Sequence, residues 1–261
     1  MKYIITALDA EARVFCEHYS LKRSYVLPYT LYTDDETLLL VCGMGKMNAL
    51  MATSALLGYR IPKEEDILVN IGICGAPKNY PIGEALLIHQ IIEGDRHHYP
   101  DILYTHPLRE SPLICVDAPR SSPSEFPVDM ESGGVFSAAS KFFKLHQMGF
   151  VKIVSDHFEP HRVTKEGVIE LLDSHTSTLE EIIRSLQDSA VTTNLFSPDE
   201  RREIETFKTL FTKSQGSALE DALCFFRLKN GSNIITLPTL IPNSKRERSA
   251  LLEEYIAALI S

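Results

Sequence analysis

The chain has 261 residues, 44% of them apolar and 23% charged, a globular composition that excludes a disordered or fibrous protein. Its formal net charge of −9 argues against broad binding of nucleic acid, which needs a cationic surface. No apolar run approaches the roughly 20 residues that span a bilayer, and Asp9 and Glu11 come too early for a secretion signal. We therefore expect a soluble, cytoplasmic protein that binds neither nucleic acid nor a membrane.

Short apolar runs alternate with helical patterns over the first two-thirds of the chain. Each run is apolar on both faces, as in the centre of a sheet that is covered on both sides. The predicted strands are Tyr3–Ala7, Leu38–Cys42, Ile67–Ile71, Glu84–Ile92, Leu113–Val116 and Val151–Val154. The predicted helices are Met47–Leu57, Gly133–Leu145 and a pattern over 164–187. This alternation predicts a three-layer α/β domain.

After about residue 190 the pattern becomes helical. Ser197, followed by Pro198 and by Glu200 at the third helical position, predicts one helix start, and Ser217 with Glu220 predicts a second. Lys245–Ile260 is a third predicted helix, and only Ile234–Leu237 could form a strand. This segment holds nine basic and nine acidic residues, so the net charge belongs to the part before it. We divide the chain into an α/β domain over 1–189 and a C-terminal helical extension over 190–261.

The five cysteines are dispersed and include no CxxC pair, which favours reduced thiols over a disulfide frame or a zinc site. Neighbouring His97 and His98 also lack the spacing of metal ligands, so we expect no metal. A GxGxxG fingerprint and a P-loop are both missing from the sequence, and we expect no cofactor.

Three segments stand at the ends of predicted strands, where ligands of open α/β sheets gather. The first is Ala7-Leu8-Asp9-Ala10-Glu11, in which Glu11 could hold and deprotonate a water molecule. The same residues also fit an ordinary acidic first turn of a helix, stabilised by the helix dipole.

The second segment is a pair of glycine turns, with Gly43 and Gly45 in one and Gly72 and Gly75 in the other. Glycines after a strand let the backbone approach a ligand and leave N–H groups free to bind it. Two tight strand–helix turns without a ligand explain the pattern equally well.

The third segment joins Met130 and Glu131, ahead of a predicted helix, to Ser155 and Asp156 at the end of a predicted strand. Both carboxylates could face one cleft, and a carboxyl group at a strand end is placed to act as a general acid. A helix-start Glu131 and a solvated loop Asp156 remain the alternative.

In their order and spacing, these segments over about residues 1–187 resemble the nucleoside phosphorylase and nucleosidase superfamily, most closely its methylthioadenosine/S-adenosylhomocysteine nucleosidase branch. The resemblance implies a phosphorylase/hydrolase-like fold with a central mixed sheet. It also implies cleavage of an N-glycosidic bond. By this resemblance Glu11 positions the attacking water and Asp156, after Ser155, protonates the leaving purine. The resemblance also implies that Met130 packs on the sugar and that Glu131 binds the ribose hydroxyls. The glycine turn of Gly43 and Gly45 lies beside the ribose, and Gly72 and Gly75 match the second glycine turn of the family.

The sequence departs from the family pattern at two positions. Ile73 replaces a hydroxyl residue of the second glycine turn, and Pro119 replaces an aromatic residue that stacks on the base. Lys46 is the only cation near the first glycine turn, which favours water over phosphate as nucleophile, although Arg13 and Lys152 could also bind phosphate.

Three functions follow as alternatives. The first is a nucleosidase, the second a phosphate-dependent nucleoside phosphorylase, and the third a nucleoside-binding protein that has lost turnover. The partner expected in each case is a small nucleoside, and the resemblance implies a homo-oligomer such as a dimer.

Overall fold

The structure is a computed structural model that describes residues 1–190, 195–230, 235–239, 242 and 244–260. The chain divides into two units, Met1–Val191 and Thr192–Ser261. The first unit is built on one sheet with helices against it, and the second is helical.

The sheet of the first unit combines parallel and antiparallel pairs, so the predicted mixed sheet is confirmed. Its strands are β1 (Lys2–Thr6), β2 (Lys22–Ser24), β3 (Thr30–Thr33), β4 (Thr37–Val41), β5 (Ile67–Gly75), β6 (Ala85–Glu93), β7 (Arg96–His98), β8 (Arg109–Cys115), β9 (Val128–Asp129) and β10 (Met148–Asp156). Their order is β10-β6-β8-β9-β5-β1-β4-β3-β2, with β7 paired to β6.

One strand closes part of this sheet on itself. β10 pairs in parallel with β5 and antiparallel with β6, so that β5, β9, β8, β6 and β10 form a ring. The carboxyl ends of β1, β5 and β10 lie next to one another, because these three strands are parallel neighbours. This edge of the sheet carries the residues discussed below.

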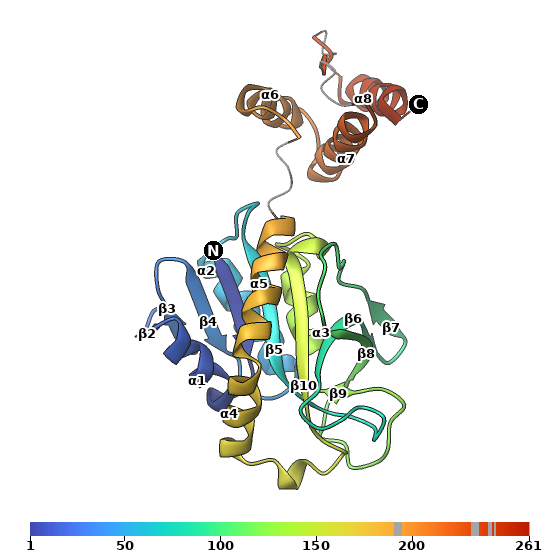
Figure 1. Cartoon of the computed structure of the whole chain (residues 1–261). Helices are drawn as coiled ribbons and strands as arrows, with labels where there is room; N and C mark the ends of the chain where they lie inside the picture. The colour runs from blue at the N-terminus through green and yellow to red at the C-terminus, as the bar shows by residue number, and fades with distance from the viewer. Residues whose placement is uncertain (191–194, 231–234, 240–241, 243, 261) are drawn as a thin grey trace. The chain divides into compact units, whose positions relative to one another are not determined.

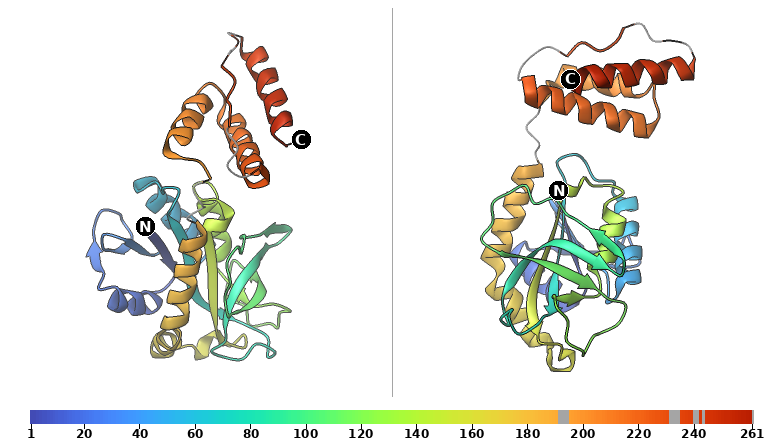
Figure 2. Two further views of the ribbon diagram at one scale, coloured as in Figure 1. Left: turned by 45° about the horizontal axis from the view of Figure 1, so that its top comes forward. Right: turned by 90° about the vertical axis from the view of Figure 1, so that its right-hand side faces the viewer.

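Helices cover both faces of the sheet, as Figures 1 and 2 show. The helices α1 (Asp9–His18), α4 (Lys165–Ser174) and α5 (Thr176–Ala190) lie on one face, and α2 (Lys46–Tyr59) and α3 (Ser132–Ala139) lie on the other. Each face has its own apolar core. The strand residues Ile4 and Val69 pack with α1 and α5 on the first face, whereas Ile5 and Leu68 pack with α2 and α3 on the second. This alternation of neighbouring residues explains why the strands are apolar on both faces.

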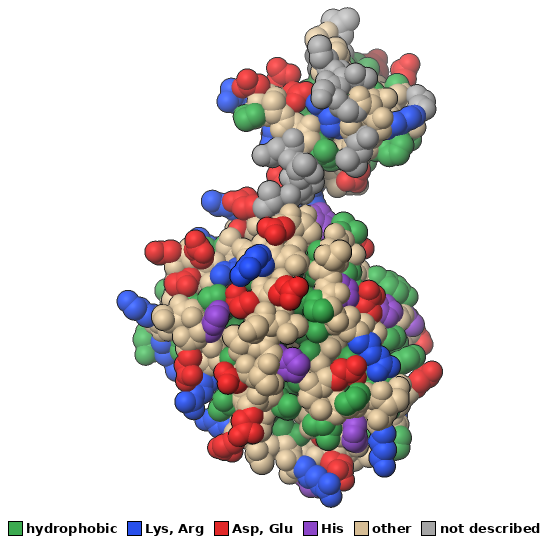
Figure 3. Space-filling view, in the orientation of Figure 1, with side chains coloured by type: hydrophobic (Ala, Val, Ile, Leu, Met, Phe, Trp, Pro, Cys, Tyr) green, Lys and Arg blue, Asp and Glu red, His purple; other side chains and the backbone are tan. Residues whose placement is uncertain are grey.

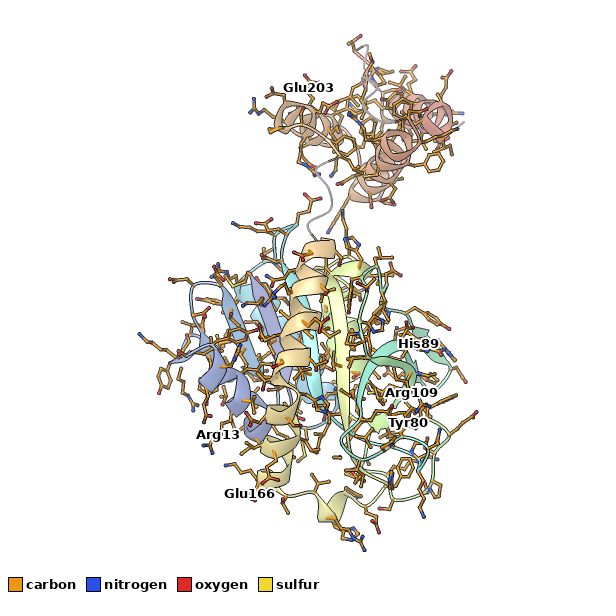
Figure 4. The ribbon with its side chains drawn as sticks, in the orientation of Figure 1. Arg13, Tyr80, His89, Arg109, Glu166 and Glu203 are labelled. Carbon is orange, nitrogen blue, oxygen red and sulfur yellow. The ribbon has the colours of Figure 1, made fainter. Side chains whose placement is uncertain are left out.

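The loop that follows β5 is fastened to β8. An Arg109 nitrogen donates to the carbonyl oxygen of Asn79 at 3.1 Å, and the guanidinium lies over the Tyr80 ring at 4.0 Å from its centroid (Figure 4). The Tyr80 hydroxyl accepts a hydrogen bond from Ser111 of β8 at 3.1 Å. These contacts fix the chain directly after Gly75.

The second unit contains α6 (Pro198–Lys208), α7 (Lys213–Asn230) and α8 (Lys245–Ile260), packed around apolar side chains that include Phe207, Leu223 and Leu252. Ser197 caps α6 in the predicted capping box, with Glu200 reaching back to the N–H of Ser197.

The predicted capping box at Ser217 and Glu220 is wrong, because both residues lie inside α7. The helix begins earlier, where Thr212 and Gln215 form an equivalent pair of hydrogen bonds. The predicted strand at Ile234–Leu237 is also wrong over 235–237, which form no strand, while residue 234 lies outside the described residues.

Two helix predictions in the first unit need correction. The helix predicted over Gly133–Leu145 ends at Ala139, where the chain turns so that Phe143 enters the core. The pattern over 164–187 is two helices, because the chain turns at His175, whose ring contacts the carbonyl oxygen of Gly83 at 2.7 Å. The short strands β2, β3, β7 and β9 are absent from the sequence prediction.

Acidic and basic side chains are interspersed over the first unit on the face shown in Figure 3, and the described residues form no continuous basic surface there. No helix among the described residues is long and apolar enough to cross a membrane.

Candidate active site

A cavity of about 300 Å³ opens at the strand ends of the first unit. Six of the nine residues predicted for the site line it, namely Glu11, Gly75, Met130, Glu131, Ser155 and Asp156. The other three glycines lie outside its lining: Gly72 and Gly45 contact the carboxylates of the cavity, and Gly43 shapes the turn before Gly45 and lies nearest to Asn48. Segments that are 145 residues apart in the chain thus meet at one cavity.

Glu11 is held in position by three backbone N–H groups. Its Oε2 accepts hydrogen bonds from Ala7 and Leu8 at 2.8 and 2.9 Å, and its Oε1 accepts one from Ile73 at 3.0 Å. The first two bonds form because Glu11 is the third residue of α1 and reaches back to the helix start. Gly72 leaves room for the carboxylate, since a Cβ atom there would lie 2.8 Å from Oε1.

The environment of Glu11 raises the pKa of its carboxyl group. The side chain is only 1% exposed, and burial raises its pKa above the ordinary value. The positive charge of Lys152 and the three backbone donors oppose this rise without cancelling it. A carboxylate of raised pKa is a stronger base, which suits the removal of a proton from water.

Glu131 connects two segments that are far apart in the sequence. Its Oε1 accepts the N–H of Gly45 at 2.7 Å, and Gly45 adopts φ +98°, a conformation that favours glycine. Burial, followed by the negative charge of Asp129, raises the pKa of Glu131 to about 7. The carboxylate therefore takes up a proton close to neutral pH.

An ion pair lies beneath this group. Lys152 Nζ is 2.9 Å from Asp129 Oδ2, with the two side chains 2% and 1% exposed. Asp129 also accepts the N–H of Ser132 at 3.0 Å, which starts α3. Burial alone would lower the pKa of Lys152, but the charges of Asp129 and Glu131 outweigh it and hold that pKa above its ordinary value.

Sequence reasoning did not assign Asp129 to the site, and the structure places it in the cavity wall. Its Oδ1 is buried and has no hydrogen-bond partner among the described residues, which is unusual for a buried polar atom. A polar residue within the short apolar stretch before Met130 was the signal that could have identified it.

Asp156 stands at the last position of β10, next to Gly75 of β5. The strand pairing shifts between Val154 and Asp156, which turns the end of β10 toward the cavity. Asp156 Oδ2 accepts the Ser155 hydroxyl at 2.7 Å, and Oδ1 accepts the N–H of Glu159 at 2.7 Å. Both oxygens are thereby oriented while the side chain still lines the cavity.

The cavity is poor in cations that could hold phosphate. Lys152 is paired with Asp129, and Arg13 lies on α1 (Figure 4), outside the cavity lining, where it pairs with Glu17 at 2.7 Å. Lys46 pairs with Glu93 and Asp117. Among the described lining residues, Arg120 is the one cation, and it donates to Ser122 and Pro123 of its own loop.

The two residues that depart from the family pattern both line the cavity. The Ile73 side chain offers no hydrogen-bond donor, but its backbone N–H binds Glu11. Pro119 contributes an apolar wall without an aromatic ring. Within the described part of the chain, no group of three or more His, Cys, Asp or Glu side chains is arranged to hold a metal.

Neither a protein-family model nor a curated protein sequence matches the chain. Solved structures of nucleosidases do match its fold. A 5′-methylthioadenosine/S-adenosylhomocysteine nucleosidase from S. pneumoniae, solved with a transition-state inhibitor, is 18% identical with a TM-score of 0.60. The match covers 71% of this chain and 100% of that one. The chain has the nucleosidase fold.

Two further structures support this result. The nucleosidase of Colwellia psychrerythraea, solved in complex with adenine, is 17% identical, has a TM-score of 0.56, and is matched over 93% of its length and 71% of this chain. The apo 5′-methylthioadenosine nucleosidase of Arabidopsis thaliana is 20% identical, has a TM-score of 0.54, and is matched over 96% of its length and 74% of this chain. The predicted resemblance to nucleosidases is thus confirmed at the level of the fold.

Proposed function

We propose that the protein cleaves the N-glycosidic bond of a nucleoside with water as the nucleophile. The observation that carries this proposal is that Glu11, Glu131 and Asp156 converge on one cavity, while the buried Lys152 beneath it is already paired with Asp129. The nucleosidase fold supports the same chemistry.

Glu11 and Asp156 each carry out one proton transfer of the reaction. Glu11 accepts a proton from the water whose oxygen attacks C1′ of the sugar, and Asp156 donates a proton to the base as the C1′–N bond breaks. The products are the free sugar and the free base, and the two carboxyl groups regain their starting protonation by exchanging one proton. Glu131 accepts the ribose hydroxyls, and Met130 packs against the sugar. Ser155 orients Asp156, and Gly72 and Gly75 leave room for the carboxylates of Glu11 and Asp156. The N–H of Gly45 holds Glu131.

Water is favoured over phosphate by the charges around the cavity. Four carboxylate side chains line it, those of Glu11, Asp129, Glu131 and Asp156, and a phosphate dianion would be repelled by them. Phosphorylases need cations that are free to bind phosphate. The described lining residues supply only Arg120.

The experiment is to measure free-base release from purine nucleosides and 5′-substituted adenosines, with and without phosphate. We expect release without phosphate. Glu11→Gln and Asp156→Asn should each lower kcat by about 100- to 10,000-fold, while Glu17→Gln, an exposed glutamate on the same helix as Glu11, should leave it unchanged. Release that requires phosphate would identify a phosphorylase instead.

A nucleoside-binding protein without turnover is the second candidate, and Ile73 and Pro119 are the observations in its favour. Both positions lack the side chains that the family pattern carries. In that case nucleosides would raise the Tm of the protein, and no base would appear from any substrate.

We further propose that the first unit is the three-layer phosphorylase/hydrolase-like domain and that residues 190–261 are a helical extension of it. Cys16, Cys42, Cys74 and Cys115 are free thiols, and the last three of these are buried, which supports a reducing, cytoplasmic setting.

We also propose that the protein works as a homodimer through α2. Met47 and Met51 lie exposed at helical spacing, and Met44 before them is 64% exposed although it lines the cavity. A second copy over this face would cover the open side of the cavity. Met51→Glu should shift the mass measured by light scattering from dimer to monomer, whereas a dimer that persists in Met51→Glu and Met47→Glu would contradict this interface.

A further inference from the structure

Phe158 has an unusual backbone conformation beside the candidate acid. It adopts φ +64°, in the left-handed region that bulky residues rarely occupy. It lies two positions after Asp156 in the chain, and the hydrogen bond from Glu159 N–H to Asp156 Oδ1, at 2.7 Å, closes the turn around it. The same carboxylate that could act as the acid therefore also holds the turn that directs Phe158.

The ring of Phe158 and the carboxylate of Asp156 lie over the same glycine. A Cβ atom on Gly75 would be 3.6 Å from Phe158 Cδ1 and 3.4 Å from Asp156 Oδ1. Both side chains line the cavity. A base that receives a proton from Asp156 is consequently within reach of the Phe158 ring.

Packing in the hydrophobic core does not explain the position of the Phe158 side chain. The side chain is 8% exposed, yet it is not part of either apolar core of the first unit. Among the described residues that line the cavity it is the one aromatic side chain, and Pro119 occupies the position where the family pattern has an aromatic residue.

We propose that Phe158 is the aromatic surface on which the leaving base stacks, beside Asp156. The inference rests on the proposed function, because it takes the base to lie at the Asp156 end of the cavity. Stacking recognises the flat face of a base, so the site accepts substrates with an aromatic base and depends little on the pattern of hydrogen-bonding groups at its edge.

The chain contains no tryptophan, which makes a direct test available. In Phe158→Trp the new indole is the only one, so its fluorescence reports on this position alone. We expect adenine and hypoxanthine to quench it saturably. Phe142→Trp is the matched control, because Phe142 is exposed and lies outside the cavity lining, and its fluorescence should not respond. Equal quenching at both positions, or none at position 158 while dialysis shows base bound to the wild type, would overturn the proposal.

A second pair of variants tests the contribution of the ring. Phe158→Leu keeps an apolar side chain and removes the aromatic face, and it should raise the KM, or the Kd for the free base, by about 5- to 150-fold with a smaller change in kcat. Phe158→Tyr should restore the wild-type value. Thermal melts establish that each variant is folded.

The outcomes separate this inference from the proposed function. Saturable quenching of Phe158→Trp without turnover of any nucleoside would keep the stacking surface and reject the hydrolase. Turnover with an unchanged KM in a folded Phe158→Leu would reject the stacking surface and keep the hydrolase. Absence of both base binding and turnover in the wild type would overturn both.

Discussion

Lys152 and Asp129 form an ion pair that is nearly closed to solvent, with 2.9 Å between Nζ and Oδ2. The pair joins β10, which carries Asp156, to β9, which precedes Glu131. One lysine thus stands among three buried carboxylates, because the charges of Glu11 and Glu131 also act on it. The positive charge of Lys152 offsets the repulsion between these acidic groups, which lie close to one another.

Removing the lysine should therefore destabilise the fold. Lys152→Met leaves Asp129 buried without its cation, and loss of one partner of a buried pair costs about 3–5 kcal/mol. Urea unfolding measures this change. The exposed pair of Arg13 and Glu17 is the matched control, and Arg13→Met should leave the free energy of unfolding unchanged. Similar values for the two variants would show that the buried pair is not stabilising.

Glu131 should make stability depend on pH. Its pKa is raised from 4.5 to about 7 in the folded protein, so the folded chain retains a proton that the unfolded chain has lost. The stabilisation that comes from this retained proton is full below about pH 4.5 and is lost as the pH rises toward 7. The free energy of unfolding therefore falls across this window. Glu131→Gln cannot titrate and should flatten that part of the curve measured by urea unfolding. An unchanged slope in this variant would contradict the assignment.

Gly72→Ala should affect catalysis through Glu11. The new Cβ would lie 2.8 Å from Oε1, closer than real contacts allow, and would push the carboxylate away from the N–H of Ile73. Since misplacement by about 1 Å can cost 100-fold in rate, we expect a loss of about that size in kcat. Gly75→Ala is the milder comparison, because its Cβ would lie 3.4 Å from Asp156 Oδ1. Equal activity of Gly72→Ala and the wild type would show that Glu11 has another position available.

Gly134→Ala should act on stability instead. A Cβ at this position would collide with the carbonyl oxygen of Lys46 and lie 3.0 Å from the N of Leu50, so α2 and α3 would have to move apart. Overpacking of this kind costs about 1–3 kcal/mol, which denaturant unfolding detects. Gly58→Ala on α2 has open space around its Cβ and is the control, with no loss expected.

Much of the fold was predictable because the apolar runs of the buried strands are local features of the sequence. β5 and β10 nevertheless continue past their predicted ends, through Gly72 and Gly75 in one and Ser155 in the other. Polar residues inside them find partners far away in the chain, as Asn70 does when it donates to the carbonyl oxygen of Ile5 at 3.0 Å. Such long-range bonds leave no pattern in the neighbouring residues.

The candidate site was likewise predictable only in part. Glu11 and Asp156 could be proposed from their places after strands, because that position has a general meaning in α/β proteins. The place of Phe158 could not, since it depends on one left-handed residue and on the packing over Gly75. In the second unit, α7 is capped by Thr212 and Gln215 and not by the predicted Ser217 and Glu220, although both pairs fit the capping pattern.

β10 is hydrogen-bonded to a neighbour on each side, to β5 on one and to β6 on the other. Its amide protons should be among the slowest of the chain to exchange with solvent, because no single edge can open to release them. The candidate acid therefore stands at the end of a strand whose middle is hydrogen-bonded on both sides. On the proposed function, a nucleoside would enter between the segments 116–127 and 157–163, which line the same cavity and belong mostly to loops. On the proposed function, the candidate acid stands at the end of a strand that is paired on both sides, and the entrance to the cavity is formed by the loop segments that flank this strand.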